Sequence, residues 1–147
     1  MKTYLEQYYE LIKNGEVIVG YWIRKEIENL IDDLNDTAYI YDTTEANKRI
    51  KFIQSLCLQS KHPYFGKPVQ LMPWQLAFIE CLYSFKMRET GLRRFVEALL
   101  EIGRKNGKST LLAADGNTDL FIGAGGAEIC CASNDDRQAK LIWREIA

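Results

Sequence analysis

The chain has 147 residues, of which 47% are apolar and 27% are charged, and its formal net charge at pH 7 is −1. This composition is typical of one soluble globular domain, and it excludes an overall basic excess, so any nucleic-acid contact must come from a local patch. No apolar stretch approaches the roughly 20 residues that span a bilayer, and the polar N-terminus does not resemble a signal peptide, so we expect a cytoplasmic protein without membrane contact. The cysteines and the single histidine show no metal-ligand spacing, so we expect reduced thiols rather than a zinc site.

Two amphipathic helices are predicted in the N-terminal part of the chain. Apolar residues recur at helical spacing between residues 1 and 14, and again between residues 21 and 34. We interpret the apolar faces of both helices as core packing without a chemical role.

A third helix is predicted to begin at Asp42 and to end near residue 60. The segment from Asp42 to Glu45 resembles a capping box, in which the first side chain accepts the N–H three residues on and the last side chain reaches back. The predicted buried stripe consists of Ala46, Ile50, Ile53 and Cys57. We interpret Lys48, Arg49 and Lys51 as a solvated surface elsewhere on this helix, with a DNA contact as the alternative.

A loop over residues 61–68 follows, because two prolines and a glycine interrupt any regular pattern. A fourth helix is predicted from about Trp74 to Phe85, with Pro73 in its first turn, where a missing N–H costs nothing. Its predicted apolar face consists of Phe78, Ile79, Leu82 and Phe85.

Gln75 is the polar residue that stands out at the start of this fourth helix. A glutamine amide both donates and accepts, so it can read the N6 and N7 edge of adenine. The alternative is a helix N-terminal glutamine that faces water, and spacing alone does not decide between the two.

A strand, a glycine-bearing loop and a helix are predicted in succession. Residues 95–102 are apolar enough for a strand, and the residues from Lys108 to about Ile122 have the composition of a helix. A phosphate-binding loop requires this order of strand, loop and helix.

The loop from Gly103 to Thr110, with the sequence Gly-Arg-Lys-Asn-Gly-Lys-Ser-Thr, carries residue types that hold a nucleoside triphosphate and Mg²⁺. Glycines such as Gly107 let backbone N–H groups turn toward phosphate oxygens, and a helix N-terminus adds a favourable dipole. The N–H groups of residues 106–110 would hold the phosphates, Lys108 would neutralise β- and γ-phosphate charge, and the Ser109 hydroxyl would hold Mg²⁺.

This loop departs from the standard pattern G-x-x-x-x-G-K-[ST]. The first glycine of the pattern falls on position 102, which is isoleucine, and Gly103 leaves only three residues before Gly107. A basic surface turn that contains Gly-Lys-Ser by chance is therefore the alternative interpretation.

A second strand is predicted over residues 127–133, and a further helix follows it. The segment from Asp135 to Gln138 resembles a capping box for that helix. The order strand, helix, strand, helix predicts an α/β fold, in which an N-terminal helical segment precedes the incomplete start of a P-loop NTPase parallel sheet with a right-handed crossover. We expect a helical region over residues 1–68 and a partial ATPase domain over residues 69–147.

Four sequence blocks together resemble the large terminase subunit of tailed bacteriophages. In chain order they are Gly66-Lys-Pro-Val-Gln-Leu-Met-Pro-Trp-Gln75, Arg93-Arg-Phe95, Arg104-Lys-Asn-Gly-Lys-Ser-Thr110 and Ala132-Ser-Asn-Asp-Asp-Arg-Gln-Ala139. The resemblance covers residues from about 42 to 147. It implies the N-terminal part of the ATPase motor that drives double-stranded DNA into an empty procapsid.

The resemblance implies a role for individual residues, with ATP and Mg²⁺ as the ligands. Gln75 would contact adenine, while Lys108 and Ser109 keep the phosphate and Mg²⁺ roles, and deviant loops are usual in this family. Arg104 or Lys105 would supply positive charge to the γ-phosphate in the transition state. The alternative role of Arg104 is to hold the loop by local hydrogen bonds.

The resemblance also implies partners and further parts. The partners would be double-stranded DNA, the portal protein and the small terminase subunit, with a homo-oligomeric ring on the procapsid. Residues 133–138 would couple nucleotide state to DNA, or would simply cap a helix. The acidic Walker B strand end, the catalytic glutamate and the nuclease lie beyond Ala147 in the family, so we expect the N-terminal part of a large subunit. The alternatives are another P-loop DNA-dependent ATPase or helicase, and a non-catalytic prophage remnant.

Overall fold

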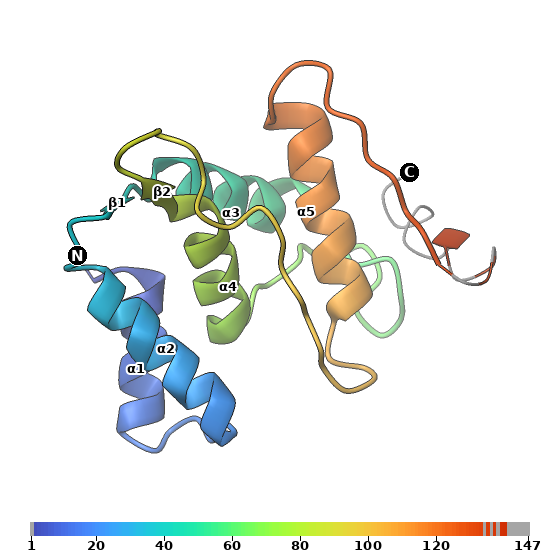
Figure 1. Cartoon of the computed structure of the whole chain (residues 1–147). Coiled ribbons are helices and arrows are strands. Elements are labelled where there is room, and N and C mark those ends of the chain that lie inside the picture. The colour runs from blue at the N-terminus through green and yellow to red at the C-terminus, as the bar shows by residue number, and fades with distance from the viewer. Residues whose placement is uncertain (1, 134, 136, 138, 141–147) are drawn as a thin grey trace. The chain divides into compact units, whose positions relative to one another are not determined.

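The computed structural model of the chain describes residues 2–133, 135, 137, 139 and 140 (Figure 1). The elements in chain order are α1 (Tyr4–Lys13), α2 (Tyr21–Asp33), β1 (Tyr39–Tyr41), α3 (Thr44–Leu56), α4 (Pro73–Ser84), β2 (Phe85–Met87) and α5 (Lys108–Ile122). Two compact units form, of which unit 1 comprises Met1–Ile50 and Leu71–Ala98, and unit 2 comprises Lys51–Gln70 and Leu99–Ala147. Within the described residues, no helix has the length and apolar content needed to cross a membrane.

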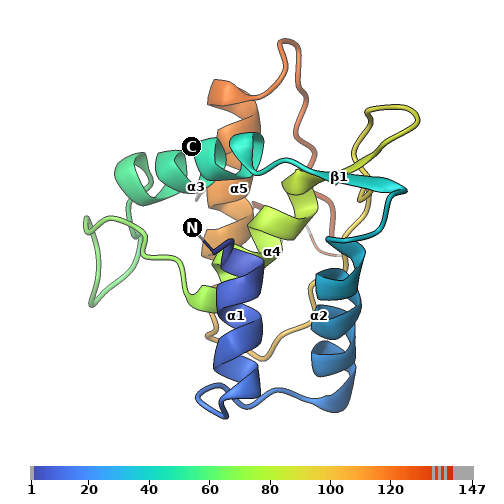
Figure 2. The same cartoon turned by 90° about the vertical axis from the view of Figure 1, so that its left-hand side faces the viewer.

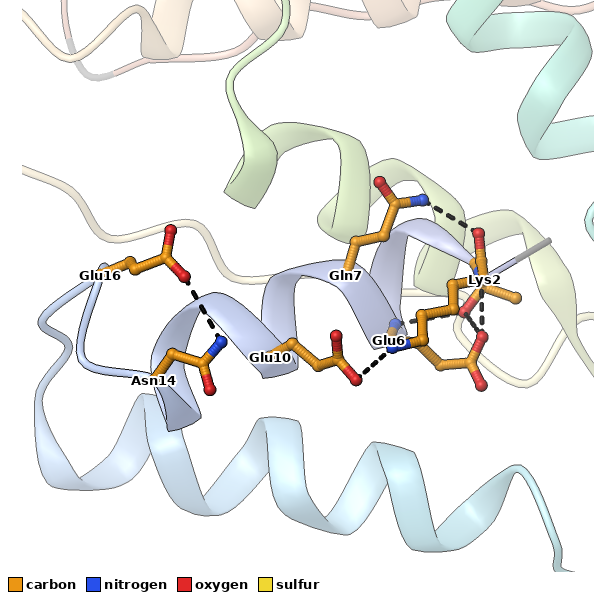
Figure 3. Close-up of polar contacts among 7 residues, drawn as sticks. Lys2, Glu6, Gln7, Glu10, Asn14 and Glu16 are labelled. Atoms are coloured by element: carbon orange, nitrogen blue, oxygen red, sulfur yellow. Dashed lines mark hydrogen bonds and ion pairs between the residues drawn. The ribbon is translucent and has the colours of Figure 1, made fainter.

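α1 begins with a capping box and further polar contacts at its N-terminus. Thr3 Oγ1 accepts the Glu6 N–H at 3.2 Å, and Glu6 Oε2 accepts the Thr3 N–H at 2.7 Å. Figure 3 shows the ion pair between Lys2 and Glu10, and the bond from Gln7 Nε2 to the Lys2 carbonyl oxygen at 2.9 Å. The capping box satisfies N–H groups that a helix start otherwise leaves without partners.

α4 is the central helix of unit 1. α1 packs against α4, and α2 lies beside α1 in the antiparallel direction (Figure 2). Each α4 side chain from Gln75 to Ser84 is buried or half-buried. Side chains on every face of a covered helix must be apolar or hydrogen-bonded. The apolar residues of α4 therefore do not form one stripe. The buried core residues around it are Leu5, Tyr8, Ile12, Leu30, Ala77, Cys81 and Phe85.

Glu80 is a carboxylate buried within this core, with an exposed fraction of 2%. Its Oε2 accepts the Leu5 N–H at 2.7 Å and the Tyr41 hydroxyl at 2.9 Å. Burial, with further contributions from Cys81 and Glu80, raises the pKa of Tyr41, so the Tyr41 hydroxyl stays protonated and donates. Glu80 therefore connects α4 with α1 and β1.

β1 and β2 form a two-stranded antiparallel sheet, in which Ile40 pairs with Lys86. The sequence analysis did not predict β1. Arg94 ties this sheet to α2, because its Nη1 donates to Asp33 Oδ2 at 2.6 Å and its Cζ lies 4.1 Å from the centre of the Tyr39 ring. The guanidinium thus has a carboxylate partner and an aromatic face.

α3 buries the predicted stripe of Ala46, Ile50, Ile53 and Cys57. The predicted capping box, however, is wrong in its partners. Asp42 Oδ1 accepts the N–H of Thr44, two residues on, at 3.1 Å, and Asp42 Oδ2 pairs with Lys86 Nζ at 2.7 Å. The Lys86 ammonium and the Thr44 side chain and N–H hold the pKa of Asp42 at about 2. Asp42 therefore joins the helix start to β2.

The interpretation of Arg49 as part of a solvated surface is also wrong. Its exposed fraction is 5%, its Nε donates to Glu45 Oε1 at 2.9 Å, and its Cζ lies 3.9 Å from the centre of the Tyr83 ring. A carboxylate one turn away and an aromatic face offset the loss of water around the guanidinium. Helical spacing along α3 could not reveal this burial, because Tyr83 comes from α4.

α5 is the long helix of unit 2, and its bounds agree with the predicted helix over residues 108–122. Its buried side chains are Leu111, Ala113, Ala114 and Thr118. The helix ends at Gly123, where a Cβ would lie 2.5 Å from the Asp119 carbonyl oxygen. Glycine at this position therefore lets the chain leave the helix without a clash.

The strands predicted at residues 95–102 and 127–133 are not formed among the described residues, although both segments are free of helix. The sheet in the described part of the chain consists of β1 and β2 only. A strand is defined by ladder bonds to a neighbour, and these two segments do not pair with each other. Val96 and Leu99 have exposed fractions of 82% and 91%, so these two apolar side chains of the first segment are not covered, whereas Phe95 packs against the core of unit 1.

We expect Glu80→Ala to lower the free energy of unfolding by about 2–3 kcal/mol, because the buried Leu5 N–H and the Tyr41 hydroxyl lose their acceptor. Tyr41→Phe removes only the hydroxyl and should cost about 1 kcal/mol. Urea denaturation followed by circular dichroism measures both, with Glu89→Ala at an exposed position as the control. An unchanged midpoint for Glu80→Ala would mean that this carboxylate does not hold unit 1 together.

Candidate functional site

The Gly103–Thr110 loop of unit 2 bends through two left-handed residues. Lys105 has a φ of 67° and Gly107 has a φ of 75°. This conformation is free for glycine but costs about 1–2 kcal/mol for a residue with a Cβ, so its surroundings must hold Lys105 in place. Left-handed residues that alternate with ordinary ones turn successive N–H groups to one side, which creates a concavity for anions.

The Asn106 side chain closes this loop on itself. Its Nδ2 donates to the Gly103 carbonyl oxygen at 3.2 Å and lies 3.5 Å from the Arg104 carbonyl oxygen. A Cβ at Gly103 would lie 3.3 Å from the same nitrogen, which is a tight contact. The absence of a side chain at Gly103 therefore lets the Asn106 amide come close. The contact of Asn106 with Arg104 uses the Arg104 carbonyl oxygen and not its side chain.

The loop leads directly into the N-terminus of α5. Gly107 is the N-cap residue, and its carbonyl oxygen accepts the Leu111 N–H at 2.9 Å. A helix leaves the N–H groups of its first turn without intrahelical acceptors, and Gly107 brings no side chain to cap them. The aligned peptide dipoles add partial positive charge at the same point, so this end of α5 favours an anion.

Three cationic side chains surround this turn. Arg104, Lys105 and Lys108 are exposed, while Ser109 and Thr110 are half-buried at the start of the helix. The positive charge of the arginine and the two lysines acts together with the helix dipole, although the net charge of the whole chain is −1. The structure thus brings all of the predicted loop residues into one cationic turn that can hold an anion with several oxygen atoms.

Gln75 belongs to unit 1 and lies in the first turn of α4. Its exposed fraction is 7%, and its Oε1 accepts the Met72 N–H at 2.8 Å. The interpretation of Gln75 as a side chain that faces water is therefore wrong. The bond to Met72 fixes the orientation of the amide, and the amide nitrogen is left to donate to another group.

The back of α5 borders a cavity of about 450 Å³ within unit 2. Its lining residues are Phe52, Leu56, Cys57, Leu58, Ser60, Val69, Thr110, Ala113, Ala114, Asn117 and Phe121. Burial raises the pKa of the Cys57 thiol, although a hydrogen bond with Asn117 opposes this shift. The sequence analysis missed this face of α5. The signal was the helical spacing of Thr110, Ala113, Ala114 and Asn117 along one side.

The predicted block at residues 132–139 is described only in part, because residues 134, 136 and 138 lie outside the described residues. Asp135 Oδ1 accepts the Arg137 N–H at 2.7 Å, and the Asp135 carbonyl oxygen accepts the Ala139 N–H at 3.1 Å. Asp135 therefore begins a helical turn, as the sequence predicted. The Gln138 half of the predicted capping box and most of the helix predicted after it lie outside the described residues.

Comparison with known protein families gives one match. A family profile described as the terminase large subunit, ATPase domain, matches residues 73–147, which is just over half of the chain. The matched region includes Gln75, the Gly103–Thr110 loop and α5. Comparisons with curated proteins and with solved structures give no match.

We expect Gly107→Ala to destabilise the chain by about 1–2 kcal/mol, because it places a Cβ on left-handed backbone at the start of α5. Gly125→Ala is the matched control, since Gly125 has no positive φ and a Cβ there would meet nothing within 4 Å. Chemical denaturation of both variants measures the difference. If the two variants unfold at the same midpoint, the left-handed turn is not a constraint of the fold.

Proposed function

The chain belongs to the terminase large subunit ATPase-domain family, and from this premise we propose that it is the N-terminal ATPase segment of a phage terminase large subunit. In this proposal the segment is part of the motor that drives double-stranded DNA into procapsids. The observation that carries the proposal is the cationic turn at the N-terminus of α5, which lies within the matched region. In this proposal residues 1–68 are the helical region and residues 69–147 are the partial ATPase segment, which contains the family match.

The Gly103–Thr110 loop is proposed as a deviant Walker A loop for ATP with Mg²⁺. The left-handed residues Lys105 and Gly107 support this, because a loop that turns its N–H groups to one side fits phosphate oxygens. Lys108 would neutralise the outer phosphates, and Ser109, half-buried beside it, would offer its hydroxyl to the metal ion. Bound Mg²⁺ would neutralise charge on the phosphates, while the residues of the chain bind and orient them.

Arg104 and Lys105 are the proposed sources of additional positive charge near the γ-phosphate. Both side chains are exposed, and the contact between Asn106 and Arg104 uses the Arg104 carbonyl oxygen rather than the guanidinium. This supports a role in which the Arg104 side chain reaches a ligand, in preference to a role in holding the loop. A cation at this position stabilises charge that develops during phosphoryl transfer.

Gln75 is proposed as the residue that contacts adenine. Its burial and the bond from the Met72 N–H to its Oε1 support this role, because they hold the amide in one orientation. A fixed amide loses less conformational freedom on binding than a mobile one. The amide nitrogen can donate to N7 of the base, and the second lone pair of Oε1 can accept from N6.

The segments at residues 95–102 and 127–133 are proposed as neighbouring strands of a parallel sheet in the assembled ATPase domain. They precede and follow α5, which is the order of a right-handed crossover unit. The exposure of Val96 and Leu99 supports this, because parallel strands are apolar on both faces and are normally covered by helices. The proposed partners are double-stranded DNA, the portal protein, the small terminase subunit and further copies of the chain in a ring.

We expect Lys108→Ala to weaken binding of ATP in the presence of Mg²⁺ by at least about tenfold, because the bound phosphates lose a cationic partner. Lys25→Ala changes an exposed lysine of α2 in unit 1 and should leave binding unchanged. Isothermal titration calorimetry measures both dissociation constants. Equal affinity of the Lys108 variant and the parent chain would refute the nucleotide site.

We expect Gln75→Glu to weaken ATP binding by about tenfold, because the carboxylate cannot donate to adenine N7. The variant keeps an oxygen for the Met72 N–H, so the bond in the first turn of α4 is retained. Titration with inorganic tripolyphosphate, which has no base, is the internal control and should give an unchanged affinity. A parallel loss for both ligands would place the effect in the fold rather than at the base.

A further inference from the structure

Residues 58–68, which we name the aromatic–basic loop, form a closed loop within unit 2 (light green in Figure 1). Beyond its ends, the Val69 N–H donates to the Cys57 carbonyl oxygen at 2.9 Å. Within it, the Gln59 N–H donates to the Lys67 carbonyl oxygen at 2.8 Å. The backbone of this loop is therefore ordered by its own hydrogen bonds rather than by burial of its tip.

The tip of the aromatic–basic loop presents aromatic rings and cations to solvent. The rings of His62 and Phe65 stack with centroids 5.8 Å apart, and Lys67 Nζ lies 5.7 Å from the centre of the Tyr64 ring. Tyr64 and Phe65 have exposed fractions of 59% and 65%. Large apolar groups that an ordered loop keeps in water contribute little to the core, which is typical of a binding surface.

The stretch of sequence that contains this loop carries charge of one sign. Residues 46–79 contain no aspartate or glutamate, whereas the whole chain has a net charge of −1. The lysine and arginine residues of the same stretch are Lys48, Arg49, Lys51, Lys61 and Lys67. Arg49 is buried in its ion pair with Glu45 in unit 1, while Lys51, Lys61 and Lys67 are exposed in unit 2. This stretch is therefore a basic segment of the sequence in an otherwise balanced chain.

We infer that the aromatic–basic loop is a contact surface for double-stranded DNA. Lys61 and Lys67 contact phosphates, and Tyr64 and Phe65 pack against sugars and base edges in a groove. The duplex form of the DNA rests on the proposed packaging function, whereas the nucleic-acid chemistry rests on the loop itself. The surface is separate in sequence from the Gly103–Thr110 loop, so it adds a DNA contact to the proposed nucleotide site.

The surface of this loop combines apolar rings with cations, and nucleic acid is a partner that matches both. A polyanion meets no carboxylate between residues 46 and 79, so nothing in this stretch repels its phosphates. Exposed rings beside the lysines match a partner that offers flat, apolar surfaces between its charges, as sugars and bases do. A closed loop also holds these side chains before binding, which lowers the entropy lost on association.

The test is fluorescence anisotropy of the full chain with a short labelled duplex, over a salt range of roughly 50–200 mM. Lys67→Gln should weaken binding about three- to tenfold and should lower the slope of log affinity against log salt by about 0.9, the value for one lost phosphate contact. Phe65→Ala should weaken binding about fivefold or more with an unchanged slope, because no charge is lost. Lys25→Gln on α2 is the matched charge control and should change neither quantity.

Binding of both loop variants with the affinity and slope of the parent chain would overturn the inference. So would a parent chain that does not bind duplex DNA, as expected if the loop serves a protein partner. The same titrations are repeated with one labelled strand of the duplex. Variant effects that appear only with this single strand would also overturn the duplex contact. Both substituted side chains are exposed, so the variants should melt like the parent chain.

The inference and the proposed function fail in different ways. ATP binding is measured on the same loop variants by calorimetry. Variants that keep both ATP and DNA binding contradict the inference and leave the nucleotide site intact. A parent chain that fails to bind ATP, with loop variants that still lose DNA, contradicts the proposed function and supports the inference.

Discussion

The proposed phosphate site depends on backbone N–H groups that turn to the same side, and the left-handed residues Lys105 and Gly107 give the loop such a turn. Glycine takes this conformation without cost, but Lys105 does not, so part of the strain is stored in the loop. The contact of Asn106 with the Gly103 carbonyl oxygen helps to hold the strained backbone. The packing of α5 in unit 2 then fixes the helix N-terminus to which the loop leads.

The constraint in unit 1 is a different one, because its central helix is surrounded on all sides and must accommodate polar side chains in the interior. α4 carries polar side chains into the interior, and two of them have a backbone partner: Glu80 accepts the Leu5 N–H, and Gln75 accepts the Met72 N–H. Buried polar groups with satisfied bonds hold a unique arrangement, because each alternative leaves one of them without a partner. The residue proposed to contact adenine is therefore held by a bond within the first turn of the central helix of this unit.

The parts of the fold that depend on local sequence were predictable. Helical periodicity predicted α1, α2, α3 and α4, composition predicted α5, and the residue types of the Gly103–Thr110 loop indicated a cationic turn at a helix start. The left-handed conformation of Lys105 was not predictable, because lysine carries no preference for it.

The parts that depend on partners distant in sequence were not predictable. Arg49 has the spacing of a surface residue but is covered by Tyr83 from α4, and Gln75 is buried although a helix start usually faces water. β1 was missed because three residues of a strand carry no reliable pattern without their partner. The apolar runs before and after α5 have the composition of strands. A strand needs a hydrogen-bonded neighbour, and the described residues provide no such neighbour for either run.

The central claim is that backbone N–H groups of the Gly103–Thr110 loop hold the phosphates of ATP, and amide hydrogen exchange tests it at those atoms. We expect addition of ATP and Mg²⁺ to slow exchange in peptides that cover residues 103–111, while peptides from α2 exchange as before, because bound phosphate oxygens occupy the loop amides. Unchanged exchange across residues 103–111 at saturating ATP would contradict the claim.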